Sequence, residues 1–368
     1  MADQLDIAED RWTDEAERWL GAQCVDPWPR GPEVRQVTLA LQGGGAHGAF
    51  TWGVLDRLLE DDRIAVEGVS GTSAGAMNAV LLAYGLALGG RAEARRRLHA
   101  FWQRAATLAA WSPLQPTAFD RLLGLGRMDL SPAWNLLDLA GRLLSPYQFN
   151  PLNLDPVRAL LADLIDFDFL RQGQAMKVYI CATNVTRGRM QIFTGSDISV
   201  EAVMASACLP FMSQAVEIDG EHYWDGGYLG NPAIYPLMQG CAAQDVVLVQ
   251  INPMRIESVP TTAQEILDRL NTLTFNAGLV REMRAIDLIT RLIDQGKITD
   301  GSLRRFYLHR IADEATMASF GASSKMNADW LFLWWLRGKG REAAERWLAE
   351  HYEALGQRSS LSIPDIYL

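Results

Sequence analysis

The chain has 368 residues, 49% of them hydrophobic, so it can build one large domain or two ordinary ones around a substantial core. Its formal net charge is -10 at pH 7, its pI is near 5.1, and no basic face dominates, which argues against nucleic acid as a partner. No run approaches the ~20 apolar residues that cross a bilayer. These totals predict a globular protein that does not span a membrane.

The N-terminal part of the chain is polar. Residues 1–34 begin with an acidic stretch and end in DPWPRGPE, which predicts an arm on the surface. This arm lacks the charged-then-apolar pattern of a secretory signal, so we expect a cytoplasmic protein. The cysteines are scattered, without a CxxC pair or a histidine cluster, and we expect reduced thiols, no metal and no cofactor. They are Cys24, Cys181, Cys208 and Cys241.

Residues 35–255 alternate between short apolar runs and helical patterns, which is typical of an α/β layer fold with parallel strands. The runs are Val37–Leu41, Ile64–Val69, Val178–Ala182 and Val246–Ile251. Within this part, residues 105–150 are rich in Leu and Trp but are cut by Pro and Gly, which predicts an inserted cap of short helices. Residues 256–368 are interpreted as a mainly helical C-terminal extension with one strand at Arg305–Ile311.

The first apolar run leads directly into LQGGGAHGAF, residues 41–50. Gly43, Gly45 and Gly48 fit GxGxxG, a pattern of dinucleotide sites. Such a site needs an acidic residue at the end of the second strand, but that strand ends in GTSAG, residues 71–75. A glycine loop that opens a helix also presents N–H donors to a developing negative charge, as an oxyanion hole requires.

GTSAG fits GxSxG, placed between an apolar strand and an almost uncharged helix, which is the setting of a nucleophile elbow. Ser73 is therefore a candidate nucleophile, flanked by Gly71 and Gly75. The alternative is that Ser73 caps the helix and that the glycines only permit close packing. The preceding glycine loop favours the interpretation of Ser73 as a nucleophile over its interpretation as a helix cap. It assigns the oxyanion hole to Gly43, Gly44, Gly45 and Ala46.

A serine nucleophile needs a base within hydrogen-bond reach. None of the histidines stands in a convincing catalytic motif; they are His47, His99, His222, His309 and His351. Asp225 is followed by Gly226 and Gly227 and can be held at the edge of a cleft. An aspartate with its ordinary pKa near 4 is a weak base, so it would serve only if buried against the hydroxyl. The alternative for DGG is an ordinary turn.

Together these blocks resemble the patatin-like phospholipases, which are lipid acyl hydrolases with a Ser–Asp dyad. GGGAHG, GTSAG, ASACLP (residues 205–210) and DGG follow in the order of that family, over roughly residues 36–255. ICATNVTRGRMQIF is similar to the strand pair that precedes the Ser/Pro block of the family. The tail, with FNAGLVREMRAI and GASSKMNADWLFLWWL, is similar to the extension of a bacterial subgroup.

The resemblance implies a three-layer α/β/α fold with a mainly parallel central sheet and a helical C-terminal extension. It implies cleavage of fatty acyl esters, as by a phospholipase A, lysophospholipase or esterase, through an acyl-enzyme on Ser73 with Asp225 as the base. The residues that would support this dyad are His47, Gly71, Gly75, Gly226 and Gly227. The family commonly has Arg or Lys at the position of His47. Because a helix N-terminus disfavours imidazolium, we expect His47 to donate a neutral hydrogen bond or simply to pack.

Three alternatives stay open at this point. An α/β-hydrolase also uses GxSxG, but its nucleophile follows several strands and its histidine comes late in the chain. An acyltransferase would share the acyl-enzyme, and a lipid-binding regulatory protein would keep the scaffold without the chemistry. Residues 105–150 would line an acyl-chain channel or form core. Residues 330–341 would contact the inner membrane surface peripherally or pack inside. The lipid or ester class and the oligomeric state are not indicated.

Overall fold

The computed structural model describes residues 28–29, 31–112, 115–117, 120, 126, 128, 131–173, 175–301 and 303–368, without the side chains of 137–140 and 142. Most of the predicted arm at 1–34 lies outside the described residues, and so does Cys24. The predicted cap at 105–150 is described only in part, since most of residues 113–130 fall outside.

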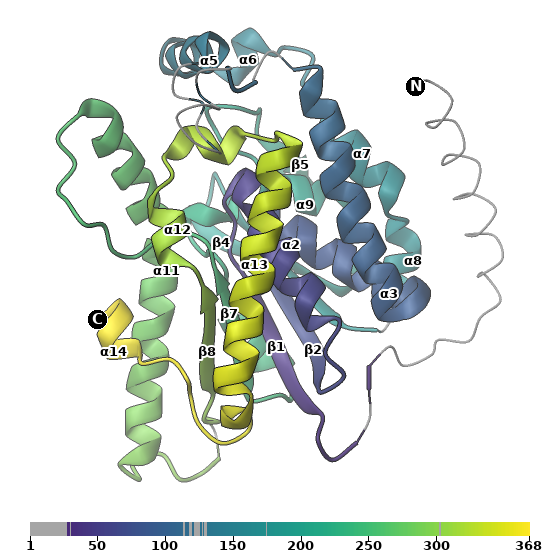
Figure 1. The fold of residues 1–368 in the computed structure, drawn as a ribbon, viewed down its shortest axis with the longest axis vertical. Coiled ribbons are helices and arrows are strands. Elements are labelled where there is room, and N and C mark those ends of the chain that lie inside the picture. Colours follow the sequence, from purple (N-terminus) through teal and green to yellow (C-terminus); the bar gives the residue numbers. More distant parts are fainter. Residues whose placement is uncertain are drawn as a thin grey trace.

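A central sheet organises the described residues (Figure 1). Its strand order is β5-β6-β3-β2-β1-β7-β8, and β4 pairs with β3. The strands are β1 (Arg35–Leu41), β2 (Ile64–Gly71), β3 (Lys177–Asn184), β4 (Arg189–Thr194), β5 (Val216–Ile218), β6 (Glu221–Asp225), β7 (Asp245–Gln250) and β8 (Tyr307–Ala312). Strands β3, β2, β1, β7 and β8 run parallel, whereas β4, β5 and β6 join in antiparallel pairs. The predicted mainly parallel sheet is therefore confirmed.

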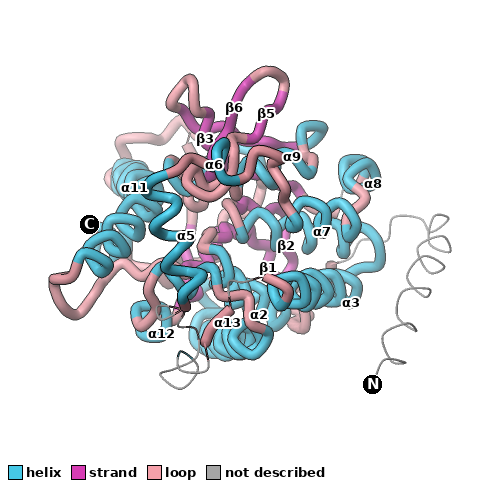
Figure 2. Tube along the Cα trace, turned by 90° about the horizontal axis from the view of Figure 1, so that it is seen from above, coloured by secondary structure: helices cyan, strands magenta, loops and turns pink. Residues whose placement is uncertain are grey.

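Helices cover both faces of this sheet (Figure 2). They are α2 (Gly48–Leu58), α3 (Ala74–Ala110), α5 (Pro132–Leu143), α6 (Pro146–Phe149), α7 (Pro156–Leu164), α8 (Phe167–Gln172), α9 (Val200–Ser206), α10 (Tyr235–Gly240), α11 (Ala263–Asp294), α12 (Glu314–Ala318), α13 (Trp330–His351) and α14 (Ile363–Tyr367). The short 3-10 turns are η1 (Gly45–His47), η2 (Gly195–Asp197), η3 (Gly226–Tyr228), η4 (Ala322–Met326) and η5 (Tyr352–Ala354).

Alternation along β1 explains the two layers of helices. Val37, Leu39 and Leu41 are buried in one cluster with α2, α3 and α13. Ala40 points to the other face, into a cluster with α10, α11 and α14. Because successive side chains of a strand point to opposite faces, one apolar strand serves two layers. The three-layer α/β/α fold is confirmed.

The C-terminal region is part of the same body as the sheet. The strand expected at Arg305–Ile311 is β8, which pairs in parallel with β7. Helix α13 lies against α2 at backbone contact, since a Cβ at Gly53 would collide with the carbonyl of Arg337 and one at Gly340 with the carbonyl of Phe50. Glycine at both positions therefore lets the two helices approach closely.

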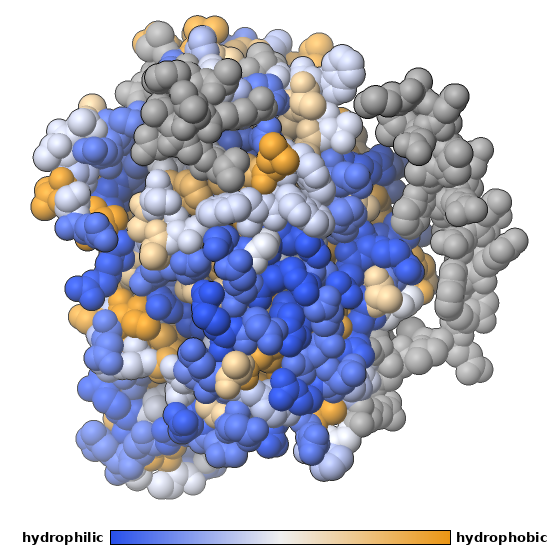
Figure 3. Space-filling model, in the orientation of Figure 1, coloured by the Kyte–Doolittle hydropathy of each residue, from blue (hydrophilic) through white to orange (hydrophobic). Residues whose placement is uncertain are grey.

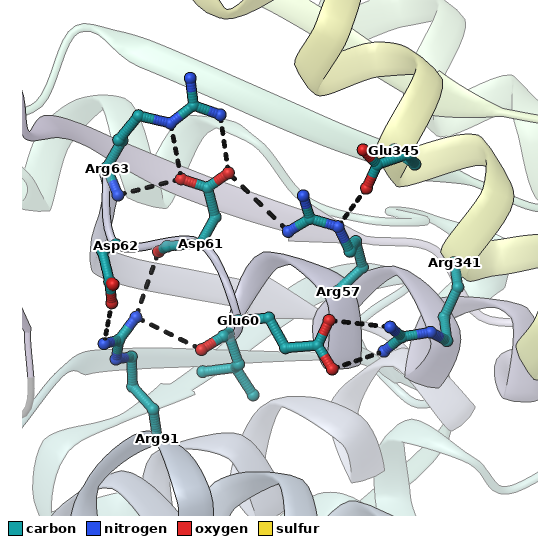
Figure 4. Close-up of polar contacts among 9 residues, drawn as sticks. Arg57, Glu60, Asp61, Asp62, Arg63, Arg91, Arg341 and Glu345 are labelled. Atoms are coloured by element: carbon teal, nitrogen blue, oxygen red, sulfur yellow. Dashed lines mark hydrogen bonds and ion pairs between the residues drawn. The ribbon is translucent and has the colours of Figure 1, made fainter.

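Ion pairs surround this helix contact. Asp56 of α2 is 3% exposed and binds Arg95 of α3 at 2.8 Å and Arg337 of α13 at 2.6 Å. Figure 4 shows neighbouring ion pairs, among which Arg341 of α13 binds Glu60 at 2.8 Å. Exposed pairs contribute about 0–1 kcal/mol each, whereas removal of the arginines that bind Asp56 would leave a buried charge without compensation, at a larger cost.

The first residues of α13 are largely aromatic, and one face of this part of the helix is buried. Phe332, Leu333 and Leu336 are buried, whereas Leu331 is 65% and Trp334 is 43% exposed. The face seen in Figure 3 is mainly hydrophilic, with separate small apolar areas. Packing therefore accounts for one face of the segment at residues 330–341, and the other residues are half-buried or exposed. No helix in the described part of the chain combines the length and apolar character needed to cross a bilayer.

Candidate active site

Ser73 lies in the sharp turn between β2 and α3. Its backbone has φ 55° and ψ -125°, a left-handed conformation that is rare for a residue other than glycine. Glycine is required on both sides, because a Cβ at Gly71 would lie 2.5 Å from the carbonyl oxygen of Gly75 and one at Gly75 would collide with that of Leu41. Such local strain is typical of a nucleophile elbow.

Asp225 ends β6 and is 0% exposed. Its backbone N–H donates to the carbonyl of Cys208 at 2.7 Å, and its Oδ1 accepts from the amide of Gly227 at 2.7 Å. Its other oxygen, Oδ2, is buried and has no hydrogen-bond partner among the described residues. Side chains at Gly226 and Gly227 would collide with Cys181 and Phe275, so DGG is more than a surface turn.

The structure brings Ser73 and Asp225 into interaction. Burial raises the pKa of Asp225 from 3.8 to about 7, and the Gly227 amide, the Ser73 hydroxyl and the Lys325 charge each oppose part of this rise. The Ser73 contact does not complete a hydrogen bond of standard geometry, since Oδ2 stays unpartnered. Such contacts are often long in enzymes without substrate. A carboxylate with a pKa near 7 matches the proton affinity of a general base.

A serine outside the predicted dyad holds the elbow in place. Oγ of Ser206, at the end of α9, accepts from the backbone N–H of Ser73 at 2.9 Å and donates to the carbonyl of Cys181 at 2.6 Å. The next residue, Ala182, is paired with Asp225 across β3 and β6. Ser206 therefore links Ser73 to the strand beside Asp225. ASACLP contains this serine, and the sequence alone assigned it no role.

The glycine loop packs directly against Ser73. A Cβ at Gly43 would lie 2.6 Å from the Cβ of Ser73, so only glycine permits this approach. The Gly43 amide is already used, because it donates to Oδ1 of Asn231 at 2.6 Å. The amides of Gly44, Gly45 and Ala46 donate no hydrogen bond to any described residue. The predicted oxyanion donors therefore narrow to these three.

A buried amide network holds the loop, and sequence reasoning did not find it. Gln42 is central: its Oε1 accepts from the amides of Ile251 and Asn252 at 2.9 and 2.7 Å. Its Nε2 donates to Oδ1 of Asn276 at 2.8 Å. Asn252 in turn donates to the carbonyl of Gly43 at 2.8 Å. These partners lie about 200 residues from the loop in sequence, so no local pattern marks them.

His47 lies at the end of η1 and is 2% exposed. Its Nε2 is 2.8 Å from Oγ of Ser324, and its ring centroid is 5.4 Å from that of Phe320. Burial, with a smaller contribution from the Lys325 charge, lowers the pKa of His47 from 6.5 to about 3. His47 is therefore neutral near pH 7 and packs against the C-terminal region.

The late histidine of an α/β-hydrolase has no counterpart at Ser73. His309 is fully buried in β8, with Nε2 2.9 Å from Oδ1 of Asp245 and Nδ1 2.9 Å from Oγ of Ser360. This group resembles a triad in composition. However, Asp245 begins β7 opposite Val37, the early part of β1, whereas Ser73 follows the last residues of β2. The two sites therefore lie at opposite ends of the parallel strands.

Within the described ranges, no three His, Cys, Asp or Glu residues are grouped to hold a metal ion. The described thiols, Cys181, Cys208 and Cys241, are buried and free. A pocket of about 420 Å³ lies beside the Ser/Pro block and is lined by Met204, Ala207 and Cys208 together with charged side chains. Cys208, whose carbonyl binds the Asp225 amide, thus borders a cavity of ligand size.

Comparisons with known proteins relate the chain to one family and to several solved structures. The family model described as patatin-like phospholipase matches residues 39–238. Among solved structures, VipD from Legionella pneumophila is 15% identical, with 82% of this chain and 67% of that chain covered and a TM-score of 0.36. ExoU of Pseudomonas aeruginosa, solved with SpcU from the type III secretion system, is 16% identical at a TM-score of 0.31. That match covers 86% of this chain and 52% of ExoU, so the chain spans about half of its length.

A search of curated proteins finds no significant match to the sequence. The family model nevertheless covers more than half of the chain, and it includes the end of β1, the glycine loop, Ser73 and Asp225. The protein therefore belongs to the patatin-like phospholipase family.

Proposed function

We propose that this protein is a serine lipid acyl hydrolase, in which Ser73 attacks a fatty acyl ester and Asp225 is the general base. One observation carries the proposal: a fully buried carboxylate with a pKa near 7 has an unpartnered oxygen and interacts with a serine in a strained elbow. A buried charge without a full set of partners is costly, and it is retained where it has a function.

The chemistry follows from these groups. Asp225 takes the hydroxyl proton as the Ser73 oxygen bonds to the carbonyl carbon, and the carbonyl oxygen becomes an anion held by the amides of Gly44, Gly45 and Ala46. The ester C–O bond then breaks, and the alcohol leaves with the proton from Asp225. Water attacks the acyl-enzyme next and gives a proton to Asp225. The bond between the Ser73 oxygen and the acyl carbon then breaks, Asp225 returns the proton to the Ser73 oxygen, and the fatty acid is released. Asp225 transfers the proton in each step, and the three amides stabilise the anion each time it forms.

Apolar side chains on the surface support a lipid substrate. Leu143, Leu144, Leu152 and Leu154, on and beside α5 and α6, are 45% to 78% exposed. Phe211, just after the Ser/Pro block, is 68% exposed, and its carbonyl lies beside Gly141 of α5. Exposed apolar groups of this size in one region are typical of a surface that meets lipid or another apolar partner.

The test combines covalent labelling with hydrolysis. We expect a fluorophosphonate to label Ser73, and Ser73→Ala to lose both labelling and activity across phospholipids, lysolipids, acylglycerols and short p-nitrophenyl esters. The exposed Ser196→Ala is the matched control and should keep both. Full activity of a folded Ser73→Ala variant would refute the mechanism. Release of fatty acid rather than transfer to an added lysolipid distinguishes the hydrolase from an acyltransferase.

A further inference from the structure

A lysine from the C-terminal region reaches the glycine loop. Lys325 lies in η4, and its ammonium donates to Oδ1 of Asn252 at 2.9 Å. The ammonium is also 5.7 Å from the ring centroid of Phe275, within reach of a cation–π interaction. The backbone of Lys325 packs on the loop as well, since a Cβ at Gly45 would collide with its carbonyl oxygen. Both its side chain and its backbone therefore contact the oxyanion segment or a residue bound to it.

Asn252 connects Lys325 to the glycine loop through two hydrogen bonds, and both donors point toward the loop. Its Oδ1 accepts from the Lys325 ammonium, which can only donate, and its Nδ2 donates at 2.8 Å to the carbonyl of Gly43, which can only accept. The same peptide carries the N–H of Gly44, one of the unpaired donors. Hydrogen bonds arranged head to tail polarise one another, by about 10–30% per bond. The charge on Lys325 thus strengthens the Gly44 N–H as a donor.

The surroundings of Lys325 favour such indirect action. The cavity that it lines with His47 and Asn252 has a volume of about 30 Å³, which is the share of one water molecule and too small for an acyl chain. Burial lowers the pKa of Lys325 to about 8, while the charges of Asp268 and Asp225 oppose this shift. The ammonium form is therefore present at neutral pH in a weakly solvated site, where a charge acts over a longer range.

Among the described residues, Lys325 is the one cation that shifts the pKa of both groups flanking the oxyanion loop. It lowers the pKa of His47 and that of Asp225. His47 itself is neutral, so the positive charge near this loop comes from Lys325. That charge opposes the rise in the pKa of Asp225 and keeps the base ionised at lower pH.

We propose that Lys325 is a positioning residue for the acyl transfer, acting through Asn252 on the Gly43–Gly44 peptide and supplying the cationic charge of the oxyanion site from the C-terminal region. This inference rests on the proposed hydrolase function. After Ser73 has attacked, the carbonyl oxygen is an anion, and the Lys325 charge stabilises it. The uncharged ester of the bound substrate is not stabilised in this way. The benefit therefore falls on kcat rather than on KM.

The experiment compares Lys325→Met, Lys325→Gln and Lys325→Arg in the full chain with a soluble p-nitrophenyl ester. Loss of one oxyanion donor lowers kcat 10²–10³-fold. The Met and Gln variants would only weaken the Gly44 N–H through Asn252, so their kcat should fall less, roughly 10- to 100-fold. KM should stay within about threefold, because the neutral ester is bound without the charge. The Arg variant should keep most of the activity. Lys339→Met, which removes a surface lysine paired with Glu342, is the matched control.

The pH–rate profile gives a readout that a packing role would not move. Without the Lys325 charge the pKa of Asp225 rises, so the acid limb of kcat/KM should move up by about 0.5 unit or more. Lys325 faces His47, Asp225 and Asp268. The other titratable groups beside Asp225 have raised pKa values and stay neutral below pH 8; they are Cys181, Cys208 and Tyr228.

The outcomes separate the two proposals. If the unaltered protein neither hydrolyses esters nor reacts with a fluorophosphonate at Ser73, the hydrolase proposal fails and the role of Lys325 falls with it. If the unaltered protein is active and the Gln and Met variants match it in kcat and in acid limb, only the Lys325 inference is overturned. Should the Met variant not fold, the comparison of Gln with Arg decides, because equal kcat values for those two would refute a role of the charge.

Discussion

Replacing Asp225 with Asn should stabilise the protein at pH 8 while abolishing its activity. A carboxyl whose pKa is raised on folding binds its proton more tightly in the folded protein than in the unfolded chain. Its ionisation therefore opposes folding. The penalty is absent below pH 3.8, grows as the pH rises and is complete above the folded-state pKa of about 7. Asn has the same shape and no charge, and its oxygen still accepts from the Gly227 amide.

The magnitude follows from the shift. Moving the pKa from 3.8 to about 7 corresponds to roughly 4 kcal/mol of destabilisation at pH 8, at about 1.4 kcal/mol per unit. The amide group that replaces Oδ2 is itself buried without a described partner, which costs about 1–3 kcal/mol at every pH. The pH dependence of the difference is therefore more informative than its absolute size.

Urea unfolding of both proteins at pH 5.5 and pH 8 measures this effect. The free energy of unfolding of Asp225→Asn, relative to the unaltered protein, should rise by about 2 kcal/mol between the two values. The exposed Asp197→Asn serves as the control and should show no comparable trend. A difference between Asp225→Asn and the unaltered protein that does not change with pH would refute the raised pKa, and with it the account of Asp225 as a base poised near neutrality.

Three further outcomes are expected. In the unaltered protein kcat/KM should rise with pH and level off above about 7 as Asp225 ionises, and an acid limb near pH 4 would contradict the burial of this carboxylate. Gly45→Ala combines φ +59° with a collision at Lys325 and should lose activity and about 3 kcal/mol or more of stability, whereas Gly188→Ala, at φ +61° in open space, should cost about 1–2 kcal/mol and keep its activity. Trp334→Ala should reduce binding to anionic vesicles without reducing hydrolysis of a soluble ester, because Trp334 is 43% exposed. Trp335→Ala should instead lower the melting temperature, since Trp335 packs on Phe320 and Phe332. If both variants changed vesicle binding and melting temperature alike, the separate roles of Trp334 in membrane contact and of Trp335 in packing would be wrong.

Much of the candidate site could be predicted because its sequence signals are local. A strand, a glycine loop and a GxSxG turn each occupy a few consecutive residues, and parallel neighbours β1 and β2 bring their ends together. Asp225 was found through its two glycines. The strand expected at Arg305–Ile311 appears as Tyr307–Ala312, one edge of the sheet.

The supporting residues could not be predicted, since they are defined only by contacts across the fold. Asn231, Asn252 and Lys325 meet the glycine loop from 188 or more positions away, and no local motif indicates these contacts. The hydrogen bond that occupies the Gly43 amide could not be predicted for the same reason, because only the folded chain places Asn231 beside it. Ser206 lay within a block of the resemblance, but its two hydrogen bonds depend on the approach of α9 to β3.

The position of β7 between β1 and β8 limits how far the chain can be shortened. The residues that match the family end at 238, within α10 and before either of these strands begins. A fragment cut at that point would turn the interior strand β1 into an open edge, with unpaired amides and carbonyls that attract strands of other molecules. Such a fragment would therefore tend to associate with its own copies, because it would lack the pairing that β7 gives to β1 in the full chain.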